Sequence, residues 1–154
     1  MTKLNTEVKR QPSEYNHHYN FDEILEEKDR KYLLRHGHVY KANSGTVLCH
    51  QNQIGNDLFF ILHGEVKITK ESDEKDLELG TLGAGDIFGE ISALFSAPRI
   101  ATVATNKPSV ILEMDKDDFI KLLEQAPNLK QVVYKQLSKR KLQTTIQTQQ
   151  AANG

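Results

Sequence analysis

The spacing of apolar residues divides the chain into three parts. Residues 1–20 are polar and have almost no apolar periodicity, so we expect a flexible tail there. From Asn20 onward, apolar residues recur at roughly helical spacing until Gly37. This pattern predicts a helix, in one or two pieces, that is capped by Asn20 and ends at Gly37.

The middle of the chain consists of short apolar stretches separated by glycines. Seven of the nine glycines lie between Gly45 and Gly89, and residues 66–69 alternate as a half-buried strand does. His63-Gly64-Glu65 is typical of a hairpin turn. The expected strands are residues 38–42, 46–49, 58–62, 66–70, 77–82, 101–105 and 109–115, with one more ending at Phe88. We therefore predict an antiparallel eight-stranded β-roll or jelly roll over about residues 38–115.

Helical spacing returns after the last predicted strand. Asp115 can cap a helix over residues 116–125, and Pro127 fits the first turn of a last helix. The last helix carries an apolar stripe, formed by Leu129, Val132, Val133, Leu137 and Leu142. The predicted fold class is mainly β with flanking helices. One domain is expected over residues 21–143, with its C-terminal helices over 116–143, and a tail or linker over 144–154.

Composition narrows the setting of this domain. The 154 residues include 20 basic and 21 acidic side chains, and this near-zero balance argues against nucleic acid or an anionic membrane as a partner. The longest apolar run, residues 58–62, is far shorter than the ~20 residues that span a bilayer, and residues 1–20 contain no signal-peptide segment. Cys49 is the only cysteine, so no internal disulfide exists. We expect a cytoplasmic module.

The segment with candidate chemistry follows the strand that ends at Phe88. A short helix beginning after Gly89 would leave the amides of residues 90–92 as hydrogen-bond donors for an anion, above all a phosphate. Arg99 can bind two phosphate oxygens at once. The carboxylate of Glu90 can accept hydrogen bonds from a sugar hydroxyl. Together these groups predict a nucleotide-like ligand with an anionic end and a hydroxyl-bearing end.

The same residues resemble a known family. Phe88-Gly89-Glu90, followed after eight residues by Arg99-Ile100-Ala101, resembles the phosphate-binding cassette of cyclic nucleotide-binding domains. Residues 55–66 and 82–90 are similar to the family's strand-turn-strand stretch and to the approach to its cassette, so the resemblance covers roughly residues 29–140. Such domains occur in regulatory subunits of cAMP-dependent protein kinase, in catabolite activator proteins and in cyclic nucleotide-gated channels.

The resemblance implies roles for the residues of the cassette. Arg99 would neutralise the cyclic phosphate, with help from the amides of Ser92 and Ile100. Glu90 and the backbone of Gly89 would hold the ribose 2′-hydroxyl. The whole ligand-binding set that the resemblance implies is Phe88, Gly89, Glu90, Ile91, Ser92, Arg99, Ile100, Ala101, Val103 and Tyr134.

The resemblance also implies how the base is enclosed and which base is preferred. Val103, with Val47 or Leu48, would line the face beneath the base. The last helix would supply a lid, around Tyr134, Leu137 and Arg140. Domains selective for cGMP often have threonine directly after the arginine, and Ile100 has no such hydroxyl. The sequence therefore favours cAMP over cGMP.

The function implied is that of a non-catalytic regulatory domain with a cyclic nucleotide as ligand and no metal or cofactor. Ligand contacts would draw the short helix against the roll, and the C-terminal hinge and lid helices would move with it. These helices would control an attached output domain or an associated partner protein. The few residues after Leu142 are too short for a helix-turn-helix domain, so we expect a stand-alone sensor or a regulatory portion of a longer polypeptide.

Other functions stay open at this point. The stripe of the last helix would also suit a homodimer or a nucleotide-independent docking module. An enzyme on a cupin-like roll is disfavoured because His36 and His38, although spaced like metal ligands, are followed by no carboxylate at cupin-like spacing. A family member that keeps the fold without binding nucleotide would usually lack the arginine or the glutamate, and this chain has both.

Overall fold

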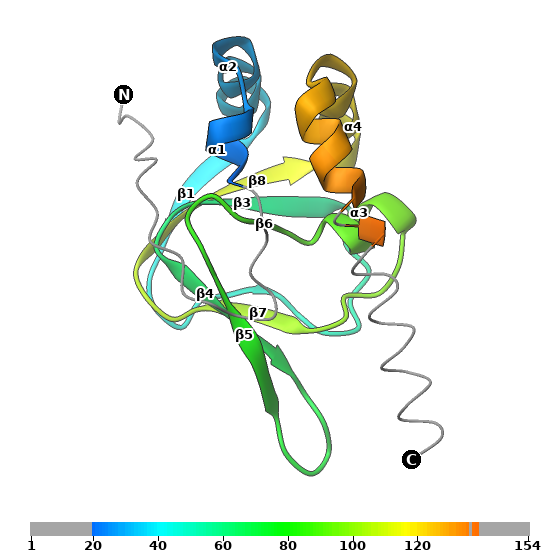
Figure 1. Cartoon of the computed structure of the whole chain (residues 1–154). Coiled ribbons are helices and arrows are strands. Elements are labelled where there is room, and N and C mark those ends of the chain that lie inside the picture. Colours follow the sequence, from blue (N-terminus) through cyan, green and yellow to red (C-terminus); the bar gives the residue numbers. More distant parts are fainter. Residues whose placement is uncertain (1–19, 136, 139–154) are drawn as a thin grey trace.

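The computed structural model of the chain describes residues 20–135, 137 and 138 (Figure 1). Two helices, α1 (Phe21–Ile24) and α2 (Glu27–His36), precede the strands β1 (His38–Ala42), β2 (Val47–Cys49), β3 (Asp57–His63), β4 (Glu65–Lys70), β5 (Leu77–Gly83) and β6 (Ile87–Phe88). A short helix follows, α3 (Glu90–Phe95), and then β7 (Thr102–Thr105), β8 (Ser109–Asp115) and α4 (Lys116–Gln125). Residues 127–135 are again helical.

The strands form two four-stranded sheets that face each other (Figure 1). The first sheet has the order β1-β8-β3-β6 and the second the order β2-β7-β4-β5, and all neighbouring strands are antiparallel. Helices α2 and α4 lie on the outer side of the first sheet. The predicted antiparallel β-roll with flanking helices is therefore confirmed.

Strand β3 runs through the first sheet and is buried on both faces. Leu58, Phe60 and Leu62 pack in a core that this sheet shares with the helices. Phe59 and Ile61 pack in a second core between the two sheets. Successive side chains of a strand point to opposite faces, so a strand covered on both sides is apolar throughout rather than alternating.

The N-terminal helix is in two pieces because a second helix start lies within it. Asn20 caps α1 as predicted, since its side chain accepts a hydrogen bond from the Asp22 amide at 3.0 Å. The Asp29 carboxylate then accepts a hydrogen bond from the Glu26 amide at 3.2 Å, which begins α2. Gly37 ends α2 as predicted.

The helices before and after the sheets are joined to one another. The Tyr32 hydroxyl of α2 donates to the Asp118 carbonyl of α4 at 2.9 Å. The Gln125 side chain at the end of α4 donates to the Asp29 carboxylate at 3.0 Å. Among the described residues, no helix is long and apolar enough to span a membrane.

The apolar stripe of the last helix packs against the domain itself. Leu129, Val133 and Leu137 are buried in the core that the first sheet shares with the helices. Leu142 lies outside the described residues. The homodimer through this stripe therefore stays a prediction, and the part of the stripe that the structure describes is covered within the chain.

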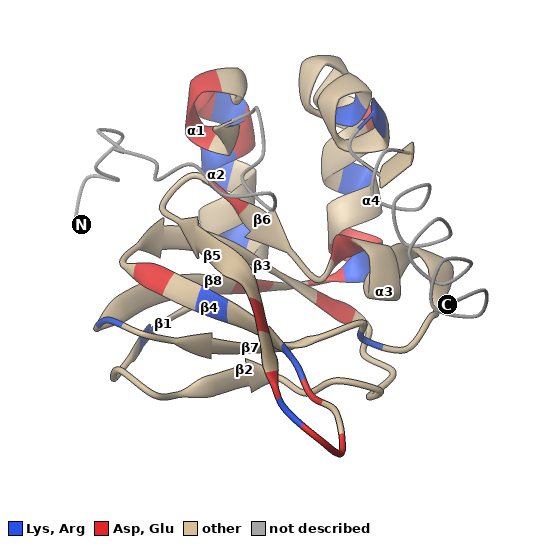
Figure 2. Ribbon diagram, turned by 60° about the horizontal axis from the view of Figure 1, so that its bottom comes forward, with Lys and Arg blue, Asp and Glu red and all other residues tan. Residues whose placement is uncertain are grey.

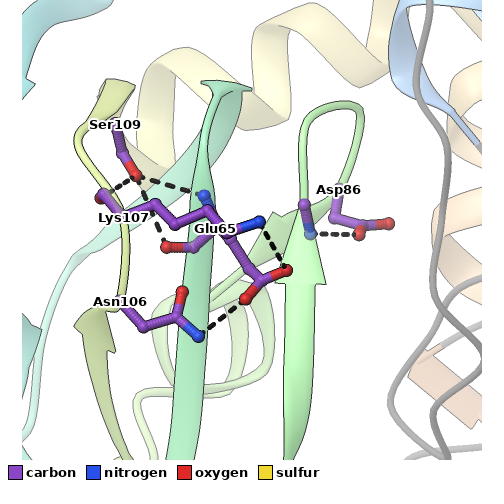
Figure 3. A network of polar contacts seen from close by, with 6 residues as sticks. Glu65, Asp86, Asn106, Lys107 and Ser109 are labelled. Atoms are coloured by element: carbon purple, nitrogen blue, oxygen red, sulfur yellow. Dashed lines mark hydrogen bonds and ion pairs between the residues drawn. The ribbon is translucent and has the colours of Figure 1, made fainter. Parts of the chain in front are cut away.

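A polar network holds the turn between β3 and β4 at one end of the roll (Figure 3). Gly64 has φ +96°, which fits the predicted hairpin turn. The Ser109 hydroxyl accepts a hydrogen bond from the Glu65 amide at 3.2 Å and donates to the Lys107 carbonyl at 2.8 Å. The Glu65 carboxylate accepts a hydrogen bond from the Asn106 side chain at 2.6 Å. These bonds join the start of β4 to the connection between β7 and β8.

Candidate functional site

The candidate cassette begins where β6 ends and α3 starts. In the turn before β6, the Asp86 carboxylate accepts a hydrogen bond from the Gly83 amide at 2.9 Å (Figure 3). Gly89 follows β6 with φ +84°, a left-handed conformation that favours glycine. The first bond within α3 runs from the Ala93 amide to the Gly89 carbonyl at 3.1 Å. The amides of the preceding residues of α3 have no carbonyl within the helix to bind.

Arg99 is the buried cation of the cassette, with 7% of its surface exposed. Its Nη1 donates to the Gly89 carbonyl at 3.0 Å, and its Nη2 donates to the Asp57 carbonyl at 2.7 Å. The guanidinium carbon lies 5.8 Å from the centre of the Phe59 ring. Since a guanidinium has five N–H groups, these two bonds position it and leave donors for an anionic ligand.

The guanidinium of Arg99 fits where it does because Gly55 and Gly89 have no side chains there. A Cβ atom at Gly55 would lie 2.2 Å from Arg99 Nη2, and one at Gly89 would lie 2.6 Å from Arg99 Nη1. Sequence reasoning assigned Gly89 to the ligand but gave Gly55 no role beyond the family resemblance. The sequence carries no sign of this proximity, because Gly55 and Arg99 are far apart in the chain and come together only on folding.

The residues at the start of α3 are buried beside this arginine. Glu90 is 1% exposed and directly follows the residue whose carbonyl accepts the Arg99 hydrogen bond. The Ser92 hydroxyl donates to the Ala97 carbonyl at 2.5 Å. The Ser92 side chain is therefore bonded to the backbone just after α3. The group that Ser92 is predicted to offer to a ligand is its backbone amide. The structure thus buries both Arg99 and Glu90, and Arg99 is bonded to the residue just before Glu90, whereas their shared role toward a ligand stays a prediction.

Two carboxyl groups that sequence reasoning did not single out lie near Arg99. Burial raises the pKa of Glu113 to about 7, and the hydrogen bond and charge of Asp57 act in the same direction, whereas Arg99 acts in the opposite direction. The Tyr40 hydroxyl lies 3.4 Å from Glu113 Oε1. Burial, followed by the charge of Glu113, raises the pKa of Tyr40. A sequence signal did exist, since Glu113 is a charged residue between the apolar residues Leu112 and Met114 of β8.

The other predicted residues divide into buried and exposed groups. Phe88 stacks on Phe59 with ring centres 4.8 Å apart, and Ala101 and Val103 are buried between the sheets. Ile91 packs at the edge of the core that the helices share with the first sheet. The side chain of Ile100 is exposed.

The structure describes only some of the residues that are predicted to contact the base or form the lid. Val47 is exposed, whereas Leu48 packs against the core between the sheets. Tyr134 is 51% exposed, and the Lys130 ammonium lies 5.9 Å from the centre of its ring. Arg140 lies outside the described residues. The lid therefore stays a prediction.

The histidine pair near the first strand has ordinary neighbours. The His36 ring lies against that of Tyr32 with centres 4.2 Å apart, and His36 Nδ1 lies 3.9 Å from an Asp118 carboxylate oxygen. The His38 ring lies 5.7 Å from that of Tyr40. In the part of the chain that the structure describes, no group of three or more metal-ligating side chains is assembled.

Comparisons with known proteins agree with this geometry. A family model for the cyclic nucleotide-binding domain matches residues 39–126, more than half of the chain. The chain is 27% identical over 118 residues to a cAMP-dependent protein kinase regulatory subunit of Yarrowia lipolytica, a match that covers 77% of this chain and 30% of that protein. The chain spans less than two thirds of the length of the first curated relatives that it matches.

Two solved structures show the likeness in three dimensions. The catabolite activator protein of Thermus thermophilus has a TM-score of 0.70 at 19% identity, over 83% of this chain and 61% of that one, which is a likeness of fold. The regulatory domain of Toxoplasma gondii PKA, solved with cAMP, has a TM-score of 0.59 at 29% identity, over 67% of this chain and 40% of that one.

Proposed function

Because the chain belongs to the family of cyclic nucleotide-binding domains, we propose that it is a non-catalytic regulatory domain that senses cAMP. The observation that carries this proposal is the position of Arg99. Its guanidinium is buried, held by the carbonyls of Gly89 and Asp57, and set beside the start of α3. A buried cation that is already oriented needs little rearrangement to accept a phosphate, which favours binding.

The two ends of a cyclic nucleotide would be bound by different groups of this corner. Arg99 neutralises the phosphate charge, and the amides of Ser92 and Ile100 donate to its oxygens. Glu90 accepts a hydrogen bond from the ribose 2′-hydroxyl. A carboxylate in this place would repel a bare anion, so the combination of Glu90 with Arg99 favours a ligand that has both a phosphate and a neighbouring hydroxyl.

The preference for cAMP rests on Ile100 and on two relatives. Ile100 carries no hydroxyl that could bind the amino group of guanine, and its side chain is exposed at the cassette. The Yarrowia lipolytica relative is a regulatory subunit of a cAMP-dependent protein kinase, and the Toxoplasma gondii regulatory domain was solved with cAMP. These observations support cAMP as the stronger ligand and cGMP as the weaker one.

Regulation would follow from the core that α3 shares with the C-terminal helices. Ala93 of α3, Phe119 of α4 and Leu129 of the last helix belong to one buried cluster. A displacement of α3 toward a bound nucleotide therefore changes the packing of both later helices, and this motion is the signal passed to an output domain or partner. To turn a 1:99 mixture of two states into 99:1, the ligand must favour the closed state by ~5.5 kcal/mol.

The test is calorimetric titration of the wild-type chain and of Arg99→Leu with cAMP, cGMP and 5′-AMP. We expect cAMP to bind most tightly and 5′-AMP, which lacks the ring-closed phosphate, to bind least. Arg99→Leu should weaken cAMP binding by ~2–5 kcal/mol, because the phosphate then lacks its counter-charge. Equal affinity in the variant and the wild type would refute the assignment.

A matched control is Arg30→Leu. Arg30 also donates to a carbonyl and a carboxylate, at 2.6 Å and 3.0 Å, but both belong to Asp22 on the helical side of the domain. This variant should lower the free energy of unfolding and leave cAMP affinity unchanged. A loss of cAMP binding in both variants would indicate general damage to the fold rather than a phosphate site at Arg99.

A further inference from the structure

The backbone of Arg99 is held by the loop between β2 and β3. The Arg99 amide donates to the Gln53 carbonyl at 2.7 Å, and the Asn52 amide donates to the Arg99 carbonyl at 2.8 Å. The position of the guanidinium therefore depends on where this loop lies. Asn52 has φ +71°, an uncommon conformation for a residue other than glycine, so the loop needs support from outside itself.

That support comes from the side chain of Gln51. Its Nε2 donates to the Glu71 carbonyl at 3.1 Å, and its Oε1 accepts a hydrogen bond from the Glu71 amide at 2.7 Å. The carboxamide of Gln51 thus binds both the amide and the carbonyl of Glu71, as the backbone of a neighbouring strand would. Glu71 directly follows β4, at the start of a charged connection that extends from the roll toward β5 (Figure 2).

The ring is closed by the hydroxyl of Thr102, the first residue of β7. Thr102 Oγ1 accepts a hydrogen bond from the Gln51 amide at 3.0 Å and donates to Glu71 Oε1 at 2.9 Å. Gln51, Glu71 and Thr102, which we call the polar ring, therefore bind one another in every pairing. The ring anchors the loop that pairs with Arg99 and, at the same time, the strand that begins shortly after Arg99.

We infer that the polar ring positions Arg99 for its anionic ligand, so that Gln51, Glu71 and Thr102 are positioning residues for cyclic nucleotide binding. The inference rests on the proposed function. The space for the guanidinium is tight, since a Cβ at either Gly55 or Gly89 would overlap it. A loop that shifts by a fraction of an ångström therefore moves the guanidinium away from its carbonyl acceptors and from the ligand.

The ring is expected to matter more for affinity than for stability. The hydrogen bonds between Gln51 and Glu71 are solvent-exposed, and the side chains of both residues lie outside the two cores. Exposed hydrogen bonds contribute little net stability because water replaces them when they break. Their loss releases the loop without unfolding the sheets.

The experiment compares Gln51→Ala with Asn106→Ala as a matched control. Asn106 also has a side-chain amide bound to a glutamate, Glu65, through a solvent-exposed hydrogen bond, but it lies after the opposite end of β7. We expect Gln51→Ala to weaken cAMP binding about three- to tenfold, and Asn106→Ala to leave it unchanged. The Arg99 Nε–H resonance of the ligand-free protein should shift or broaden in Gln51→Ala only. Thr102→Val, which removes only the hydroxyl, should act in the same direction as Gln51→Ala.

A double-mutant cycle separates positioning from general damage. In an Arg99→Lys background, Gln51→Ala should no longer weaken cAMP binding, because the group that the ring positions is gone. Equal losses in both backgrounds, or unchanged affinity in Gln51→Ala, would overturn the inference. If the wild type binds no cyclic nucleotide, the proposed function fails. The positioning of Arg99 by the polar ring is then tested by the Arg99 resonance of the ligand-free protein alone. An unchanged resonance in Gln51→Ala would refute this positioning role.

Discussion

The charges beside Arg99 come from residues that lie far apart in the sequence. Asp57 begins β3, Glu113 lies in β8, and their two carboxyl groups interact with each other, while the charge of Arg99 acts on Glu113. The charge of Glu113 therefore acts on the arginine that is proposed to bind the ligand. A neutral Glu113 reduces the negative charge at the site, so its protonation state matters for both stability and binding.

This residue makes stability depend on pH. Burial first, and Asp57 second, raise the pKa of Glu113 from 4.5 to about 7 in the folded chain. Between these pH values the folded state binds a proton that the unfolded state releases, so the free energy of unfolding should fall as pH rises from about 4.5 to about 7. Glu113→Gln removes this dependence.

The measurement is urea unfolding of the wild type and Glu113→Gln between pH 4 and pH 8. The variant should gain stability relative to the wild type as pH rises through this window. Glu78→Gln, at an exposed position of β5, is the control and should follow the wild type. Parallel pH profiles for Glu113→Gln and the wild type would contradict the role given to Glu113.

At the level of elements, the site forms where the loop before β3 meets the start of α3. A methyl group at Gly55 would lie 2.2 Å from Arg99 Nη2, and the backbone at Gly55 is not left-handed. Gly55→Ala should therefore displace the flexible end of Arg99 with little strain elsewhere. We expect cAMP affinity to fall about tenfold or more, and the free energy of unfolding to change far less.

Gly83→Ala is the matched control for this substitution. Gly83 ends β5, and its Cβ would meet only the Gly64 carbonyl, at 3.8 Å, which is an ordinary contact. Calorimetric titration with cAMP and urea unfolding should find this variant close to the wild type in both quantities. A normal affinity in Gly55→Ala would show that the guanidinium does not need this space.

The elements themselves were largely predictable. The predicted limits of β1, β8 and α4 are the observed ones, and Asp115 caps α4 by accepting a hydrogen bond from the Asp117 amide at 2.7 Å. The break between α1 and α2 was harder to predict. It depends on the hydrogen bond between the Glu26 amide and the Asp29 carboxylate, and glutamate is not a typical N-cap residue. Strand limits elsewhere differ by a residue or so, where pairing partners rather than local pattern decide the end of a strand.

For the whole molecule, the proposed function predicts stabilisation by ligand. A ligand at 100 times its Kd stabilises the folded state by ~2.7 kcal/mol, which for a domain of this size raises Tm by about 5–10 °C. Thermal unfolding with and without cAMP measures this shift. In Arg99→Leu the same cAMP concentration should leave Tm nearly unchanged. An equal shift in the variant would place the ligand away from Arg99.

Short-range chemistry explains what could be read from the chain. The period of apolar residues, the capping side chains, the glycine turns and the spacing of Glu90 and Arg99 each act within a few residues, so they predicted the roll, its helices and the class of ligand. The carbonyl of Asp57, which is 42 residues from Arg99, has no such local mark. The space at Gly55, the pair of Asp57 and Glu113, and the polar ring likewise join residues that are distant in sequence, so no local pattern predicts them.

Those features arose only when the strands paired and the two cores closed. Which strands become neighbours depends on burying apolar residues on both faces of β3, and that condition applies to the whole chain at once. The orientation of the Arg99 guanidinium is a consequence of this packing, because its acceptors are backbone atoms whose positions the sheets decide.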